Sequence, residues 1–389
     1  MKPTFVTILQ LSEIAALLKD PGMIPLYLSR IGYDSTFVSF LPQEIVNSRE
    51  ELKELRESVR VESLPQGKPL FGKIDMTSPS IFKYIWKNAK HIDVLNLYYM
   101  KHSILYGTLY KLLNPKGIFY LKLDIDYLTF VRQESQKIEP LRRWVYQQYL
   151  RFVPDIVSAE TNPSVDYVRK RFCPPKEKLL LVPDGIDDEL IEANDLKLFS
   201  YPDRPNRFLV VGRIGAYPKN HEFLLDAIRY IKDWKDWEIN FVGPIQETFE
   251  TYIQNYFKHN PQLQERVHFI GAINDRIELL SLYNNSKVFC MSSRWESFGF
   301  VYAEAQYFGN YILSTPVSSI DDFVENDRGL GIVVSEAKEM GNAMQNIIDG
   351  KVPINDTFEK RVQHGERFRW STICKNLNEE LIKLLNNHI

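Results

Sequence analysis

Short runs of β-branched and aromatic residues alternate with amphipathic helical patterns along most of the chain. The runs are almost continuously apolar, which is typical of strands in a parallel sheet whose two faces are both covered by helices. The alternation predicts a doubly wound α/β fold. The strands that we expect lie at residues 4–9, 34–40, 94–97, 117–123, 156–159, 179–182, 208–211, 238–242, 267–270, 288–291 and 311–314.

The chain has 389 residues, which fits two domains better than one. A polar, turn-rich segment over residues 199–207 precedes a strong strand pattern and predicts the boundary between the domains. We expect a first domain over 1–197 and a second over 198–370. The C-terminal helix, 371–389, could cap either domain and could cross back to the first.

Composition excludes several classes of protein. The formal net charge of −2 gives no reason to expect nucleic-acid binding. The three cysteines are far apart and lack metal-ligand spacing, which is typical of reduced thiols in a cytosolic protein. The N-terminal apolar run is too short for a signal peptide, and no segment approaches the roughly 20 apolar residues of a membrane-spanning helix. We therefore expect a cytoplasmic protein, with any membrane contact being peripheral and at the inner face of the membrane.

A loop with two glycines and two cations follows the seventh expected strand. Arg213 and Lys219 stand in this loop, at the carboxyl end of the strand, where ligands bind in open α/β sheets. Two cations there suit a diphosphate, although for this loop taken alone we favour the simpler interpretation of a solvated loop with chance basic residues. Gly212 and Gly215 lack the third glycine of a dinucleotide fingerprint, so they only weakly support NAD binding. Asn220 is expected to cap the helix that follows.

Two carboxylates flank a glycine turn after the strand at 288–291. Glu296 precedes the Ser-Phe-Gly turn at 297–299, and Glu304 lies on the apolar helix expected over 298–308. A glycine turn that opens a helix presents free backbone N–H groups, which bind phosphate. Such amides beside two carboxylates suit a sugar nucleotide. Each carboxylate also has a structural interpretation, Glu296 as a surface acid at a helix start and Glu304 as a buried acid paired with an arginine.

Four landmarks in the second half of the chain stand in the order of a known family. In chain order they are Pro183-Asp-Gly-Ile-Asp187, Gly-Arg-Ile with Lys219-Asn220, His268-Phe-Ile-Gly271, and Glu296-Ser-Phe-Gly with Glu304-Ala. Through them the chain resembles the retaining glycosyltransferases of family 4, which have the GT-B fold. The first half resembles that family only loosely, in residues 20–34, which are similar to its first glycine loop and helix.

The resemblance implies two Rossmann-like domains facing a central cleft, with the nucleotide held by the second domain. It implies that Arg213 and Lys219 stabilise the leaving diphosphate, that Glu296 acts as a catalytic residue by positioning the donor sugar, and that Glu304 holds the ribose. Further donor contacts are implied at Gly22, at the backbone near Ile273, and at Ser297, Phe298, Gly299, Phe300 and Val301.

The first domain departs from the family at one position. Many members carry a His-Asp pair after the strand that corresponds to 117–123, and that histidine lies close to the reacting sugar. The chain lacks the histidine, so Lys122 or Asp124 could take its place as a catalytic residue, and the sequence does not choose between them. Retention in this family is usually explained by front-face attack assisted by the leaving phosphate, which does not require the histidine.

We expect no metal ion, and no cofactor other than the nucleotide-sugar donor. Asp124 and Asp126 have the spacing of a metal-binding Asp-x-Asp motif at a sheet edge, so metal binding is a minor alternative. His91 and His102 are isolated histidines, which we interpret as ordinary surface or core residues.

Residues 137–152 form a basic, aromatic stretch with a helical pattern. Such a helix could lie on an anionic membrane that carries a lipid-linked acceptor. It could instead pack on the sheet with its arginines reaching back to solvent. We favour the packed helix, because tertiary packing explains most amphipathic helices.

The residues and the resemblance predict a retaining hexosyltransferase. It would move a hexose from a nucleoside diphosphate sugar, expected to be a UDP-sugar, to a glycan or a lipid-linked acceptor, and the family is associated with surface polysaccharide synthesis. The alternatives are a nucleotide-sugar epimerase or phosphorylase of the same fold, and a catalytically silent GT-B binding module. The sequence does not specify the donor sugar, the acceptor, the linkage or the oligomeric state.

Overall fold

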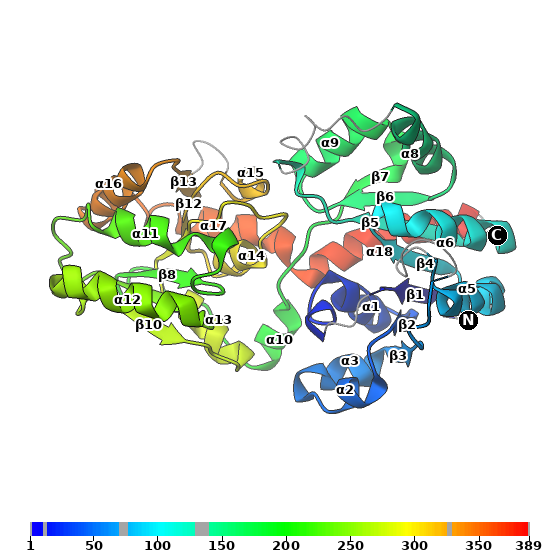
Figure 1. Ribbon diagram of the computed structural model, residues 1–389, viewed down its shortest axis with the longest axis horizontal. Helices are drawn as coiled ribbons and strands as arrows, with labels where there is room; N and C mark the ends of the chain where they lie inside the picture. Colours follow the sequence, from blue (N-terminus) through cyan, green and yellow to red (C-terminus); the bar gives the residue numbers. More distant parts are fainter. Residues whose placement is uncertain (1, 11–13, 70–76, 129–139, 325–328, 388–389) are drawn as a thin grey trace. The chain divides into compact units, whose positions relative to one another are not determined.

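The computed structural model describes residues 2–10, 14–69, 77–128, 140–324 and 329–387. The chain divides into two compact units (Figure 1). Unit 1 holds Met1–Ile125, Phe130–Asp184 and Trp370–Ile389, and unit 2 holds Asp126–Thr129 and Gly185–Arg369. Each unit is a parallel sheet with helices, so the predicted α/β class is confirmed.

Unit 1 contains a seven-stranded sheet in the order β3-β2-β1-β4-β5-β6-β7, in which every neighbouring pair is parallel. Its strands are β1 (Thr4–Ile8), β2 (Asp34–Ser39), β3 (Arg60–Ser63), β4 (Val94–Tyr98), β5 (Ile118–Leu123), β6 (Ile156–Ala159) and β7 (Leu179–Leu181). Its helices are α1 (Asp20–Arg30), α2 (Gln43–Asn47), α3 (Lys53–Ser58), α5 (Pro79–Asn88), α6 (Met100–Leu113), α8 (Pro140–Phe152), α9 (Asn162–Phe172) and α18 (Trp370–Asn387).

Unit 2 contains a six-stranded parallel sheet in the order β10-β9-β8-β11-β12-β13. Its strands are β8 (Arg207–Val211), β9 (Glu238–Val242), β10 (Val267–Gly271), β11 (Val288–Met291), β12 (Tyr311–Ser314) and β13 (Gly331–Val333). Its helices are α10 (Asp188–Ala193), α11 (His221–Ile228), α12 (Glu247–His259), α13 (Arg276–Asn284), α14 (Phe300–Tyr307), α15 (Ile320–Phe323), α16 (Ala337–Ile348) and α17 (Phe358–Gly365).

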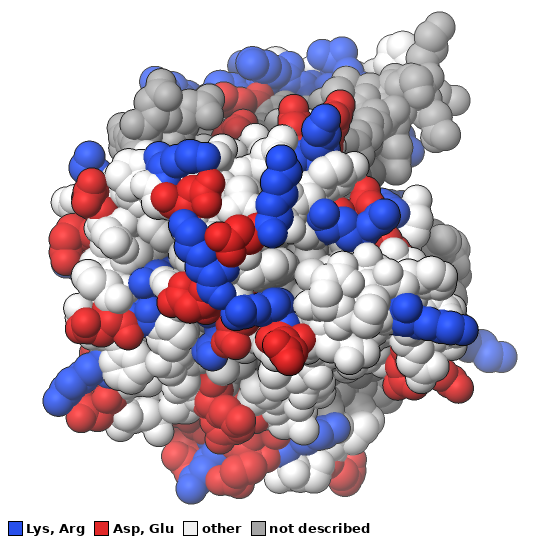
Figure 2. All heavy atoms as spheres, turned by 90° about the vertical axis from the view of Figure 1, so that its left-hand side faces the viewer, with Lys and Arg blue, Asp and Glu red and all other residues white. Residues whose placement is uncertain are grey.

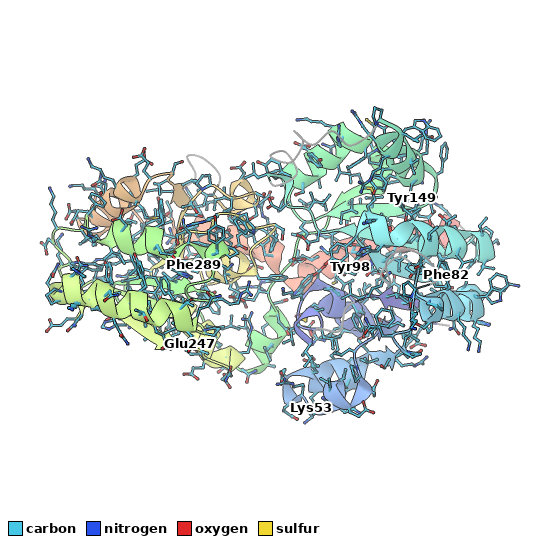
Figure 3. The ribbon with its side chains drawn as sticks, viewed as in Figure 1. Lys53, Phe82, Tyr98, Tyr149, Glu247 and Phe289 are labelled. Atoms are coloured by element: carbon cyan, nitrogen blue, oxygen red, sulfur yellow. The ribbon has the colours of Figure 1, made fainter. Side chains whose placement is uncertain are left out.

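The strand β11 shows why the strands of unit 2 are apolar on both sides. Val288 and Cys290 belong to one buried hydrophobic cluster, whereas Phe289 and Met291 belong to a second. Successive side chains of a strand point to opposite faces of the sheet, so the two clusters are the two covered faces. Phe289 is labelled in Figure 3, in the core of unit 2.

All eleven expected strands are present, each to within one residue at either end. The two edge strands β3 and β13 were not expected, because they are short and only partly buried, and β3 is mostly polar. The C-terminal helix α18 packs on α1 and β5 of unit 1, and Tyr33 donates from its hydroxyl to Asn378 at 2.8 Å.

The division between the units falls at Asp184–Gly185, earlier than the boundary expected after residue 197. Two contacts explain this position. The Ile186 N–H donates to the Phe368 carbonyl at 2.8 Å, and the side chains of Ile186 and Ile191 join a hydrophobic cluster of unit 2.

Charged residues of both signs are interspersed on the face shown in Figure 2, and neither sign forms a continuous patch there. This agrees with the small formal net charge of −2. Within the described ranges, no helix has the length and apolar character needed to cross a membrane.

Candidate active site

The candidate site residues of unit 2 gather where the strand order of its sheet reverses. The loop after β8 carries Arg213 and Lys219, and the loop after the neighbouring strand β11 carries Glu296. In an open α/β sheet the crevice outside the carboxyl ends of the strands at this reversal is where ligands bind. The topology therefore brings together, at one sheet edge, two loops whose residues Lys219 and Glu296 are 77 positions apart in the sequence.

Lys219 and Glu296 form an ion pair at this edge. The Lys219 ammonium lies 2.5 Å from Oε1 of Glu296, and the two side chains are only 19% and 14% exposed. Ser293 donates from its hydroxyl to the same oxygen at 2.8 Å. The backbones of the two loops are also joined, because the Ser292 hydroxyl donates to the Lys219 carbonyl at 3.0 Å. Cation and carboxylate are therefore held in fixed positions.

His221 holds the glycine turn that precedes Lys219. The Gly215 N–H donates to Nδ1 of His221 at 3.1 Å, so this nitrogen accepts and the ring is neutral. Burial, and then the charge of Lys219, lowers the pKa of His221 to about 4. Gly215 has a φ of +85°, and a Cβ there would lie 2.4 Å from Phe249. Neither His221 nor its role was foreseen, because a single histidine at a helix start has no distinctive sequence signal.

The turn at 297–299 places a helix N-terminus at the same edge. Gly299 is the N-cap of α14, with a φ of +81°, and the helix begins at Phe300 rather than at Phe298 as expected. The N–H groups of Phe300 and Val301 thus lie in the first turn, where a helix attracts anions. Phe298 is buried against Phe323 and Phe368, so its side chain belongs to the core.

Glu304 lies on α14 and is almost completely buried. One carboxylate oxygen, Oε1, accepts a hydrogen bond from Arg276 on α13 at 2.6 Å. This is the arginine partner that the structural interpretation of Glu304 required. The second oxygen, Oε2, is buried, and the buried hydroxyl of Tyr283 interacts with this carboxylate. Burial and then the Glu304 carboxylate raise the pKa of Tyr283 well above its usual value.

The remaining unit 2 residues lie nearer to solvent. Arg213 is exposed and forms no ion pair with any residue that the structure describes. Ser297 is half-buried in the loop before α14. Ile273 is half-buried after β10 and packs against the second hydrophobic cluster of the unit.

Lys122, at the end of β5 in unit 1, is enclosed by acids. Its ammonium lies 3.1 Å from Asp184, 3.6 Å from Asp20 and 3.8 Å from Glu160, and it donates to the Val182 carbonyl at 2.9 Å. The side chain has no exposed surface. Burial opposes its charge, but the three carboxylates raise the pKa of Lys122 well above the ordinary value. One cation faces three buried acids, and burial raises the pKa of Glu160 and of Asp20 as well.

Asp124 and Gly22 also lie at the carboxyl edge of the unit 1 sheet. Asp124 is exposed, so of the two candidates that could replace the family histidine it is the one that solvent reaches. Gly22 is buried in the first turn of α1, and a Cβ there would lie 2.0 Å from the Leu17 carbonyl oxygen. Gly22 therefore has a packing reason to be glycine, independent of any ligand.

A pocket marks the reversal of strand order in unit 1, between β1 and β4. Its cavity volume is about 70 Å³, well below the roughly 300–1,000 Å³ of small-molecule sites. Tyr99, on its wall, has a φ of +62°, a strained backbone for a residue with a side chain. No feature of the sequence indicates this strain. The lining residues are Ile8, Leu9, Gln10, Leu97, Tyr98, Tyr99, His102 and Ser103, of which Tyr98 is labelled in Figure 3.

Within the described ranges, the acids whose ligand atoms are close enough to share a metal ion are Asp20, Glu160 and Asp184. The ammonium of Lys122 already lies among them and supplies positive charge. Asp124 and Asp126 form no such group there.

Comparisons with known proteins agree with this architecture. Residues 195–367 match the family described as Glycosyl transferases group 1. A D-inositol 3-phosphate glycosyltransferase of Corynebacterium urealyticum is 24% identical over 262 residues, covering 63% of this chain and 61% of the relative. The chain thus matches less than two thirds of that relative's length.

Two solved structures share the fold over almost the whole chain. Anabaena Alr3699/HepE, determined in complex with UDP, is 16% identical with a TM-score of 0.69, covering 98% of this chain and 100% of its own. Sucrose-phosphate synthase from Thermosynechococcus elongatus is 18% identical with a TM-score of 0.70, covering 99% and 100%. Residues 195–367 are thus similar to the glycosyl transferases group 1 family, and the two Rossmann-like units have the GT-B fold.

Proposed function

We propose that this protein is a retaining hexosyltransferase that uses a UDP-sugar as donor and a glycan or lipid-linked saccharide as acceptor. The observation that carries the proposal is the Lys219–Glu296 ion pair at the strand-order reversal of unit 2. A cation for a diphosphate and a carboxylate for sugar hydroxyls are thereby fixed side by side. The complex of Anabaena Alr3699/HepE with UDP supports uridine as the base.

Departure of the nucleoside diphosphate is the step that unit 2 would assist. Negative charge grows on the phosphate oxygens as the bond to the sugar breaks, and preorganised positive groups lower that barrier. Lys219 would supply a point charge, and the guanidinium of Arg213 would supply a planar fork of donors. Arg213 is available for this contact because it is exposed at the same sheet edge. The first turn of α14, at Phe300 and Val301, would add backbone N–H groups.

Glu296 and Glu304 would hold the two ends of the donor. Glu296 would accept hydrogen bonds from the hexose, because Ser293 and Lys219 both fix its carboxylate. Glu304 would accept a ribose hydroxyl, since it lies on α14, whose first turn faces the same sheet edge, and Arg276 holds one of its oxygens in place.

Unit 1 would receive the acceptor, and Asp124 is the exposed acid at its sheet edge. In this proposal Gly22 serves the packing of α1, and Lys122 balances the charge of the buried acids around it. The reaction as proposed needs no metal ion, since the cations and amides of unit 2 stabilise the leaving group. We place the reaction in the cytoplasm, in the synthesis of a surface polysaccharide or glycoconjugate.

A screen of labelled nucleotide sugars, read by release of the nucleoside diphosphate, tests this proposal. We expect UDP release from at least one UDP-sugar, and a loss of about 100-fold in rate for Glu296→Gln, since misplacing a reacting group costs about that much. Glu247→Gln, at an exposed position on α12 labelled in Figure 3, is the matched control and should keep the full rate.

The same screen separates the alternatives. Interconversion of sugar nucleotides without acceptor would replace the proposal by an epimerase, and formation of a sugar phosphate from a glycan and inorganic phosphate would replace it by a phosphorylase. No turnover of any nucleotide sugar, together with tight UDP binding, would leave a silent binding module.

A further inference from the structure

Helix α8 carries an apolar face that no described part of the chain covers. Leu141, Trp144, Val145 and Phe152 are 69%, 56%, 40% and 69% exposed. Their separations of three, four and eleven residues from Leu141 place them on one side of an α-helix. We call these four residues the α8 stripe. Residues 137–139 of the basic stretch expected from sequence lie outside the described residues.

The opposite face of α8 already provides its packing. Leu150 is fully buried, and Tyr149, labelled in Figure 3, donates from its hydroxyl to the Ser103 hydroxyl at 2.9 Å. Tyr146 packs edge-on against Phe172 of α9, with ring centroids 6.0 Å apart. The helix is therefore anchored without the stripe, and the expectation that its apolar residues pack on the sheet fails for these four.

Cations stand on both sides of the stripe. Arg142 and Arg151 are exposed, and α8 contains no acidic residue. The guanidinium of Arg151 lies over the Phe152 ring, 5.3 Å from its centroid. The neighbouring helix α9 adds the exposed residues Arg169 and Lys170, the first of them paired with Asp166. The surroundings of the stripe are thus positive, unlike the mixed surface in Figure 2.

We propose that the α8 stripe docks this protein on an anionic lipid surface. Leu141, Trp144 and Phe152 would enter the boundary between headgroups and acyl chains, and Arg142 and Arg151 would contact lipid phosphates. An exposed apolar face with tryptophan and phenylalanine, flanked by arginines and free of acids, has the composition of helices that lie in a membrane interface. A second copy of the chain would bring like charges together at the same place, which disfavours that occupant.

This docking goes beyond the proposed transfer reaction and does not depend on it. Nucleotide binding involves unit 2, whereas the stripe and its arginines belong to unit 1. A failure of either proposal can therefore be recognised separately. If both hold, a lipid-linked acceptor would be met at the surface that the helix binds.

Co-sedimentation of the full chain with vesicles, without nucleotide, tests the docking. The vesicles are phosphatidylcholine alone, or phosphatidylcholine with about one third phosphatidylglycerol. We expect binding to the anionic vesicles, weakened by added salt, and little binding to the neutral ones. Arg142→Gln with Arg151→Gln should weaken binding about 25-fold, since each arginine near such a surface contributes about 1 kcal/mol.

A triple variant, Leu141→Ser, Trp144→Ser and Phe152→Ser, should abolish binding, whereas Trp86→Ser should leave it unchanged. Trp86 is the matched control because it is an isolated tryptophan on α5, 68% exposed. If the triple variant misfolds, the arginine variant still decides the question. Absence of binding by the wild type, binding that neither variant weakens, or a lipid-free dimer that the triple variant dissolves would each overturn the proposal.

Discussion

His221 should make unit 2 less stable as the pH falls below neutral. Its ring is buried and neutral, and burial followed by the Lys219 charge lowers its pKa to about 4. In the unfolded chain the pKa of a histidine is about 6.5, so between these values the unfolded state binds the extra proton and stability rises with pH. The stabilisation is complete above the unfolded pKa and is lost as the pH falls through the folded one.

The gap of about 2.5 pH units corresponds to at most about 3.4 kcal/mol, and about 2 kcal/mol of it is lost between pH 7 and pH 5. His221→Gln removes the titrating group while keeping a side chain that can accept from Gly215. The difference in unfolding free energy between wild type and variant should therefore fall by about 2 kcal/mol over that interval. Taking the difference cancels the contribution of the buried acids.

Histidine resonances in an NMR titration provide the direct readout, and the variant assigns the His221 signal. We expect this resonance to stay unshifted down to about pH 5, with a pKa near 4. A His221 pKa of 6 or above, or a stability difference that does not change with pH, would refute the burial argument.

Three further substitutions follow from the geometry. Glu304→Gln should reduce UDP affinity about tenfold and shrink the preference for UDP over 2′-deoxy-UDP, which calorimetry measures; an unchanged preference would exclude a ribose contact. Lys122→Met should destabilise the protein by about 3–5 kcal/mol at pH 8, because it leaves buried acids without their cation. The loss of stability should be smaller at pH 5, where the acids around Lys122 become neutral. Equal losses at both pH values would contradict the charge-balance role. Gly299→Ala should cost about 1–2 kcal/mol and weaken UDP binding, because its Cβ would lie 2.8 Å from Tyr302. Gly350→Ala, at a similar φ but with open space, should cost stability alone.

The sequence predicts the strands of the sheet interiors well because burial on both faces imposes a continuous apolar run. At the edges this constraint disappears. The strand β3 reads Arg-Val-Glu-Ser and is mostly exposed, so nothing in its composition distinguishes it from a loop. The placement of α18 on α1 depends on tertiary contacts such as Tyr33 to Asn378, which helical periodicity does not reveal.

The candidate site shows the same division between local and tertiary information. The sequence identifies Lys219 and Glu296 as residue types at strand ends, but their ion pair joins positions 77 residues apart and follows from the strand order. Asn220 is the N-cap residue of α11, as expected, but it adopts a left-handed backbone and makes no side-chain cap hydrogen bond. The residues of the α8 stripe were expected to pack inward, but they are exposed. The expectation failed because amphipathic periodicity does not tell which of two apolar faces meets the core.

The affinity of UDP for the Lys219→Met variant tests the central claim most directly. Calorimetry on the wild type, this variant and Lys258→Met, a control at an exposed position on α12, isolates the contribution of the site cation. We expect Lys219→Met to weaken UDP binding by about tenfold to 100-fold, the usual contribution of a hydrogen bond to a charged group, and the control to bind as the wild type does. Equal affinities in all three proteins would contradict a diphosphate site at the reversal between β8 and β11.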